Sequence, residues 1–200
     1  NHYALYSLLL LLFTTGHRPI RYVDVGPRHR DPSRETLLMA DKDDEDHYHT
    51  RRIWMAPRLA RQLAYYEDHS ERLLHGWEIR MQGAYRPEPA TVPYLFYIDE
   101  DYGVGPMTPS IAMNLLRDFE YEIPLNSARR LLLAELIAQG VARDIREAFL
   151  GHWIRGTEPH GRYAMLSPRR ARRELCGALE PLWDDLRIEP LPSRWSPDHG

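Results

Sequence analysis

Hydrophobic positions recur at helical spacing along most of this chain. Apolar side chains stand three and four positions apart, with Ser-Pro or Thr-Pro before several of these segments and glycine after others. The predicted helices cover residues 3–15, 57–77, 108–119, 127–140, 142–151, 162–166 and 167–186. The first helix is apolar nearly all round, so we expect it to lie at the centre of the fold.

Two short apolar runs in the N-terminal third break this helical pattern. "ETLLMA" (35–40) and "RRIWMA" (51–56) flank the polar stretch "DKDDEDHYHT" (41–50), which is typical of a β-hairpin. A further extended segment is expected at 93–98, followed by a Gly/Pro loop over 102–107. The pattern therefore predicts an α+β fold, mainly α, with a small antiparallel hairpin or sheet near the N-terminal third.

Length and composition describe one ordinary domain. The chain has 200 residues, of which 43% are hydrophobic, enough to bury a substantial core. We predict one domain over 1–186 and a proline-containing tail over 187–200. The chain starts without methionine and almost directly in an apolar helix, so we expect a fragment that lacks an upstream DNA-binding domain.

Several classes of site are disfavoured by the absence of their motifs. Cys176 is the only cysteine, so no intrachain disulfide forms and a reducing compartment fits. The apolar run 5–13 is shorter than the roughly 20 residues that span a bilayer, so we expect no membrane segment. No HExxH, GxxxxGK[ST] or GxGxxG motif occurs, so we expect no metal and no nucleotide cofactor.

Charge is distributed unevenly. The formal net charge is −3, yet residues 126–174 hold ten arginines against five acids, which fits either a basic face or a solvated arginine-rich surface. Residues 41–46 hold five acids around Lys42, the only lysine among 26 basic residues. A chain that otherwise uses arginine has kept one lysine, in an acidic turn.

Five residues stand out as candidates for chemistry, although each has an ordinary structural explanation. They are Arg18 in "TGHR", Lys42 in the turn, Arg129 in "NSARR", His152 in "LGHW" and Tyr163 in "HGRY". Singly, these could be a helix-capping charge, a solvated turn residue, a solvated helix charge, a packed imidazole and a core aromatic.

Taken in order, these motifs resemble those of the tyrosine recombinase (phage integrase) family, over about residues 4–167. That family has an apolar helix ending in T-G-x-R, a hairpin with a lysine, and H-x-x-R on a later helix. L-G-H and a tyrosine follow. The corresponding strings here are "LLLLLFTTGHR", "ADKDD", "NSARR", "LGHW" and "HGRY".

The resemblance implies a helical catalytic domain that breaks and rejoins DNA strands without metal or ATP. Tyr163 would attack a phosphodiester, leaving a 3′-phosphotyrosine bond and a free 5′-hydroxyl. Arg18 and Arg129 would clamp the non-bridging oxygens, and His152 would donate a further hydrogen bond. Lys42 would protonate the departing 5′-oxygen, which arginine cannot do because its pKa stays above about 12.

The chain departs from the family pattern at two positions. Asn126 stands where H-x-x-R has histidine, and an amide cannot take the nucleophile's proton. Arg21 stands where the family usually has an acid. The nearby Arg130, Arg155 and Arg162 are further candidates for contacts with DNA.

The expected partners are double-stranded DNA and further copies of the chain, assembled as a tetramer on DNA in the full-length protein. We expect a cytoplasmic, nucleoid-associated protein. The helix from Ser167 and the tail would dock onto a neighbouring protomer, or the helix would pack on its own domain. Two other functions stay open: a degenerate relative that binds DNA without cutting it, and a helical protein-interaction domain.

Overall fold

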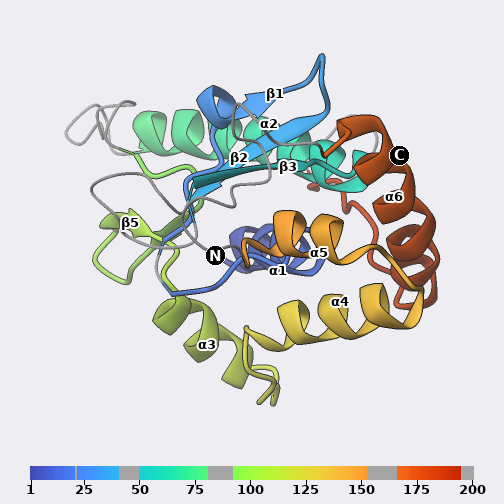
Figure 1. Ribbon diagram of the computed structural model, residues 1–200. Helices are drawn as coiled ribbons and strands as arrows, with labels where there is room; N and C mark the ends of the chain where they lie inside the picture. The colour runs from blue at the N-terminus through green and yellow to red at the C-terminus, as the bar shows by residue number, and fades with distance from the viewer. Residues whose placement is uncertain (21, 41–49, 81–91, 153–165, 195–200) are drawn as a thin grey trace.

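The computed structural model describes residues 1–20, 22–40, 50–80, 92–152 and 166–194, and Figure 1 shows helices around a small antiparallel sheet. The prediction of an α+β, mainly α fold is confirmed. The elements are α1 (His2–Thr15), η1 (Pro27–His29), β1 (Arg30–Asp31), β2 (Thr36–Ala40), β3 (Thr50–Trp54), α2 (Pro57–Arg80), β4 (Phe96–Ile98), β5 (Val104–Pro106), α3 (Pro109–Arg117), α4 (Ser127–Ala138), α5 (Arg143–Leu150) and α6 (Pro168–Asp185).

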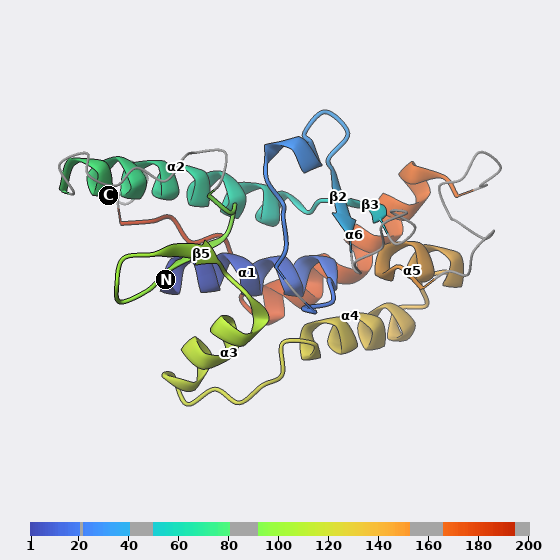
Figure 2. The same cartoon turned by 90° about the vertical axis from the view of Figure 1, so that its left-hand side faces the viewer.

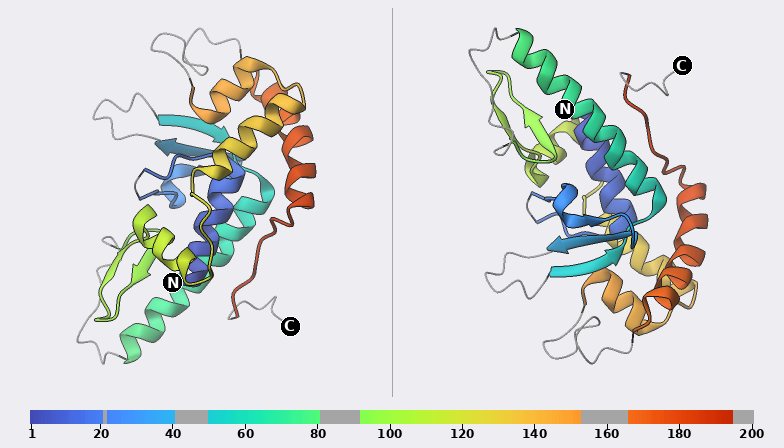
Figure 3. Two further views of the ribbon diagram at one scale, coloured as in Figure 1. Left: turned by 90° about the horizontal axis from the view of Figure 1, so that it is seen from below. Right: turned by 90° about the horizontal axis from the view of Figure 1, so that it is seen from above.

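Helix α1 forms the centre of the core, as its apolar sequence predicts. It packs against α2, α3 and α4, and its leucines at 8, 11 and 12 are buried. Figure 3 shows α1 lying alongside α2. The polar atoms in this contact are paired, since Gln62 Nε2 donates to Ser7 Oγ at 3.0 Å.

The predicted hairpin is present as β2 and β3, which pair antiparallel with Leu37 opposite Ile53 and Met39 opposite Arg51. All four of these side chains are buried, so one face of the sheet covers the core. The short strand β1 adds a third strand beside β2. No sequence pattern predicted β1, because two residues are too few to show an alternation of polar and apolar side chains.

The expected Gly/Pro loop over 102–107 was wrong in part. Strand β5 lies inside it and pairs antiparallel with β4, with Ile98 opposite Val104 and Tyr97 opposite Gly105. Glycine and proline lower strand propensity, but an edge strand tolerates both because only one side of it needs hydrogen bonds. The extended segment predicted at 93–98 is β4 with its approach.

Helix α6 and the segment after it pack on their own chain. Trp183 is fully buried, and its Nε1 donates to Phe13 O at 2.9 Å. Beyond α6 the chain runs back beside α2 (Figure 3), where Leu191 N donates to Gln62 Oε1 at 2.8 Å and Tyr3 Oη donates to Leu191 O at 2.6 Å. The described part of the predicted tail is thus held against α1 and α2. Most of the helix predicted at 162–166 lies outside the described residues.

Within the ranges that the structure describes, no helix is both long and apolar enough to cross a membrane.

Gly16, at the C-terminal end of α1, allows a test of this packing. Its φ of +61° is left-handed, and an added Cβ would lie 2.6 Å from Leu150 Cδ2. Gly140 has a similar φ of +67° with nothing within 4 Å of an added Cβ, so it is a matched control. We expect Gly16→Ala to lower the free energy of unfolding by about 2–4 kcal/mol, from backbone strain plus the close contact.

Gly140→Ala should lose only the backbone part, about 1–2 kcal/mol. Urea denaturation of both variants measures the difference. An equal loss in the two proteins would contradict the close approach of α1 and α5.

Candidate active site

The "TTGHR" stretch folds as a tightly closed helix end. The Thr15 hydroxyl donates back to Leu11 O at 2.7 Å, which satisfies a buried polar side chain inside the helix. Gly16 then turns left-handed and its N–H donates to Leu12 O at 3.0 Å. The helix ends there, and Arg18 follows as a half-buried residue.

Helix α5 ends in the same way. Gly151 is left-handed with a φ of 68°, and its N–H donates to Glu147 O. The next backbone N–H, that of His152, donates to the same oxygen at 2.9 Å. In both helices a glycine cap thus delivers a predicted site residue just past the helix end, and Figure 2 shows α4 passing beneath α1 and α5.

Arg129 joins these two helix ends. Its side chain comes from the first turn of α4 and is only 6% exposed. Its Nη1 donates to Gly16 O at 2.6 Å, and its Nη2 donates to Leu150 O. Both acceptors lie at helix C-termini, where the helix dipole is negative, so the guanidinium is stabilised at each end.

Arg129 also contacts His152. The distance from Arg129 Nη2 to His152 Nε2 is 2.7 Å. A guanidinium can only donate, so Nε2 must be the acceptor and the ring proton is on Nδ1. The contact therefore leaves His152 as a neutral ring with an N–H donor on its other nitrogen.

Arg51 also supports this site, although it was not among the residues predicted from the sequence. It lies on β3, is 2% exposed, and its Nη1 donates to Phe149 O. Two arginines from different elements thus bind consecutive carbonyls, Phe149 and Leu150, at the C-terminal end of α5. The sequence does contain a signal for the burial of Arg51, because side chains alternate along a strand and Arg51 therefore shares the inward face of Ile53.

Five of the predicted site residues line one cavity of about 450 Å³. Its lining consists of Arg18, Pro19, Ile20, Asn126, Arg129, Arg130, Leu133 and His152. The described lining contains three arginines and no acid. Such a cavity has a positive potential and several N–H donors, which is the chemistry that binds an oxyanion such as phosphate.

Other predicted site residues lie outside the described part of the chain. Lys42 lies among residues 41–49, between β2 and β3. Tyr163 lies among residues 153–165, the stretch that follows His152. The candidate DNA contacts Arg155 and Arg162 also fall in 153–165, and Arg21 likewise lies outside the described ranges.

The described tyrosines are not part of this cavity, since none of them lines it. Several are partly buried elsewhere, and Tyr66 is fully buried. Burial raises the pKa of the Tyr3 hydroxyl to about 12, and burial with the nearby Asp24 does the same for the pKa of Tyr22. A phenol with such a pKa is hard to deprotonate, so these residues are poor candidates for a nucleophile.

Within the described ranges, no three His, Cys, Asp or Glu side chains gather where they could hold a metal ion. Comparisons of the chain with protein-family models, with curated proteins and with solved structures found no match. The chemistry of the arginine-lined cavity is therefore the main guide to function.

Arg51 provides a test of how the α5 end is held. Arg51→Met keeps much of the side-chain volume but leaves the buried Phe149 carbonyl without its donor. We expect the free energy of unfolding to fall by about 1–3 kcal/mol. The neighbouring Arg52 is exposed and donates to Thr36 Oγ1 at 3.1 Å, so Arg52→Met is a matched control expected to change stability by about 0.5 kcal/mol or less.

Chemical denaturation of the two variants checks this prediction. If Arg51→Met is as stable as Arg52→Met, the buried guanidinium does not hold the α5 end.

Proposed function

We propose that this chain is a DNA strand-breaking and rejoining enzyme of the tyrosine recombinase type. The observation that supports this most is the convergence of Arg18, Arg129 and His152 on one cavity whose described lining contains no acid. These residues come from three motifs far apart in the sequence, and the resemblance assigns all three to the same phosphate.

The proposed role of the cavity is to hold a phosphodiester during attack. The transition state carries extra negative charge on its non-bridging oxygens, and cations fixed beforehand stabilise that charge without having to reorganise. Arg129 fits this role because Gly16 O, Leu150 O and His152 already fix its guanidinium. Arg18 would supply a second guanidinium and His152 an Nδ1–H donor.

The bond changes would involve Tyr163 and Lys42, whose roles rest on the resemblance. Tyr163 Oη would form a bond to phosphorus while the bond from phosphorus to the 5′-oxygen breaks. Lys42 would give its proton to that oxygen. The tyrosine proton would pass to water, because Asn126, which lines the cavity, cannot accept it. Rejoining is the reverse attack by a 5′-hydroxyl, so the proposal includes no metal and no cofactor.

Asn126 also favours a second candidate, a DNA-binding relative that does not cut. An amide at the position of the family's histidine keeps hydrogen bonding to phosphate and removes proton transfer. Arg130 lines the same cavity and would contact a neighbouring phosphate in either case. Assembly into a tetramer on DNA and a place at the nucleoid stay predictions of the resemblance.

The decisive experiment captures the covalent intermediate. Incubation with nicked double-stranded DNA that contains the target site should give a protein–DNA adduct stable in denaturing gels, because loss of the short 5′ fragment prevents rejoining. Tyr163→Phe should abolish the adduct and leave DNA affinity within about threefold, less than 1 kcal/mol.

Tyr102→Phe, at an exposed tyrosine outside the cavity, is the matched control and should form the adduct normally. A wild-type protein that binds this DNA well and forms no adduct would establish the non-cutting alternative instead.

Lys42→Arg tests the leaving-group acid. The substitution keeps the positive charge and removes the transferable proton, so cleavage of ordinary DNA should slow by about 10²–10⁴. DNA with a sulfur in place of the bridging 5′-oxygen needs no proton on its leaving group, so its cleavage rate should be restored to near the wild-type value. Single-turnover rates on both substrates make the comparison, and an equal loss on the two would rule out this role for Lys42.

A further inference from the structure

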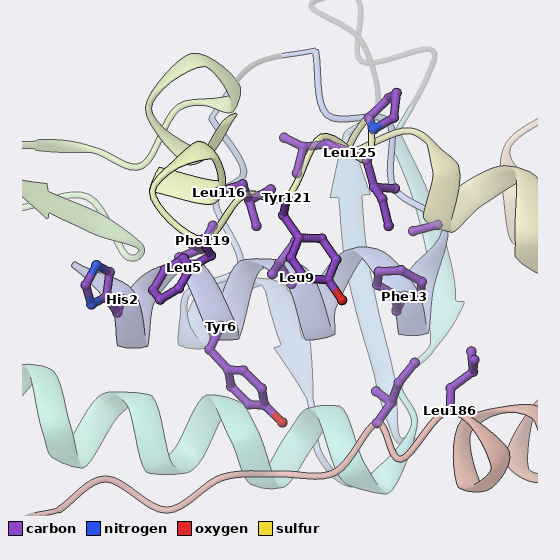
Figure 4. A pocket seen from close by; sticks show the side chains of 14 residues that line it. His2, Leu5, Tyr6, Leu9, Phe13, Leu116, Phe119, Tyr121, Leu125 and Leu186 are labelled. Atoms are coloured by element: carbon purple, nitrogen blue, oxygen red, sulfur yellow. The ribbon is translucent and has the colours of Figure 1, made fainter. Parts of the chain in front are cut away.

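A long apolar groove lies on a part of the surface that the proposed reaction does not use. It has a volume of about 730 Å³ and runs between α1, the α3–α4 connection and the segment after α6 (Figure 4). The floor is a stripe along α1 with residues three or four apart, including His2, Leu5, Leu9 and Phe13. At 1.5 Å per residue this stripe is roughly 16 Å long, about three turns of a helix.

The groove walls expose large apolar side chains. Phe119, Tyr121, Ile123 and Leu186 all line it, and each is between 45% and 55% exposed. Their clustering around one groove distinguishes them from scattered surface apolar residues. A clustered apolar patch of this kind is typical of a surface that binds another protein.

The two segments that form the groove walls also carry exposed acids next to the lining residues; these acids, none of which lines the groove itself, are called its rim below. Asp118, Glu120 and Glu122 alternate with the apolar residues of one wall and are exposed. Asp185 and Glu189 are exposed beside Leu186 and Ile188 on the other wall. Against these five acids the same two segments carry two exposed arginines, Arg117 and Arg187.

The negative charge of the rim indicates which kind of partner fits the groove. A second copy that presented the same face would bring acidic rim against acidic rim, which costs free energy. A partner with basic side chains on either side of an apolar stripe would match both the floor and the rim. The straight, helix-length floor fits an amphipathic helix, whose anchors would lie three, four and seven positions apart.

We propose that this groove binds an amphipathic helix of another protein, with aliphatic side chains on one face and lysine or arginine on its flanks. The groove supplies the apolar contacts and the acidic rim sets the preferred charge of the partner. This inference does not depend on the reaction proposed above, and its test contains no DNA.

Three labelled model peptides of 16 residues probe the groove by fluorescence anisotropy, at low and at high salt. The first has a leucine face and a lysine face, the second has glutamate in place of every lysine, and the third has serine in place of every leucine. We expect the leucine–lysine peptide to bind at least tenfold more tightly than either of the others. Its affinity should fall with salt while a measurable apolar part remains.

Variants of the protein locate the binding. Phe119→Ser combined with Ile123→Ser should weaken the leucine–lysine peptide by about tenfold or more, since two apolar anchors are lost. Ile137→Ser, at an exposed residue outside the groove, should leave affinity within about twofold. All substituted side chains are half exposed, and thermal melting of each variant confirms that its fold is intact.

Charge reversal tests the rim. Glu122→Lys should weaken the lysine peptide and tighten the glutamate peptide, whereas Glu71→Lys, at an exposed position on α2, should change neither. Equal affinity for the two charged peptides would overturn the proposal, as would binding that ignores the Phe119 and Ile123 changes. Sedimentation that shows a dimer of the protein lost in Phe119→Ser would assign the groove to a second copy and would also overturn it.

Discussion

The arrangement of this fold around its cavity depends on one buried guanidinium. Arg129 is bound by carbonyls at the C-terminal ends of α1 and α5, two helix ends that would otherwise place negative dipoles and unpaired acceptors against each other. The same group fixes the ring of His152. Close contact between Gly16 and Leu150 completes the junction, because a Cβ at position 16 would lie 2.6 Å from Leu150 Cδ2. One side chain thus stabilises the junction of three helices and orients the cavity's donors.

Much of this could be predicted from the sequence, where the signal was local. The apolar period of α1, the Thr-Pro start of α3 and the glycine caps at Gly16 and Gly151 each report their own structure over a few residues. The two-residue strand β1 and the Gly/Pro strand β5 give no such signal, because their stability comes from the strand beside them. Convergence of Arg18, Arg129 and His152 on one cavity is a long-range property that spacing alone does not encode. It was expected only through the resemblance to a family.

The charge pattern of the sequence was also a poor guide to which side chains are buried. Two arginines are among the buried polar groups of the fold: Arg129, for which a solvated helix charge was one interpretation, and Arg51, which was not among the predicted residues. They hold consecutive carbonyls of α5 from opposite sides, β3 and α4. The groove and the cavity also meet at the start of α4, where Leu125 and Ala128 line the groove and Asn126 and Arg129 line the cavity. A partner bound in the groove would therefore contact the same segment that leads into the cavity.

Hydrogen bonds from α1 and α2 to the segment after α6 reach its backbone. Tyr3 donates to the carbonyl of Leu191, Arg58 donates to that of Ile188, and Gln62 accepts the N–H of Leu191. Contacts of this kind recognise the path of a chain and not its side chains. Mutation could thus replace the exposed side chain of Leu191, provided the new residue is not proline, while the segment keeps its course; the buried Ser193 and the packed Ile188 are constrained by their own contacts. Selection on the backbone contacts would then act on Tyr3, Arg58 and Gln62, so their record would be found in α1 and α2.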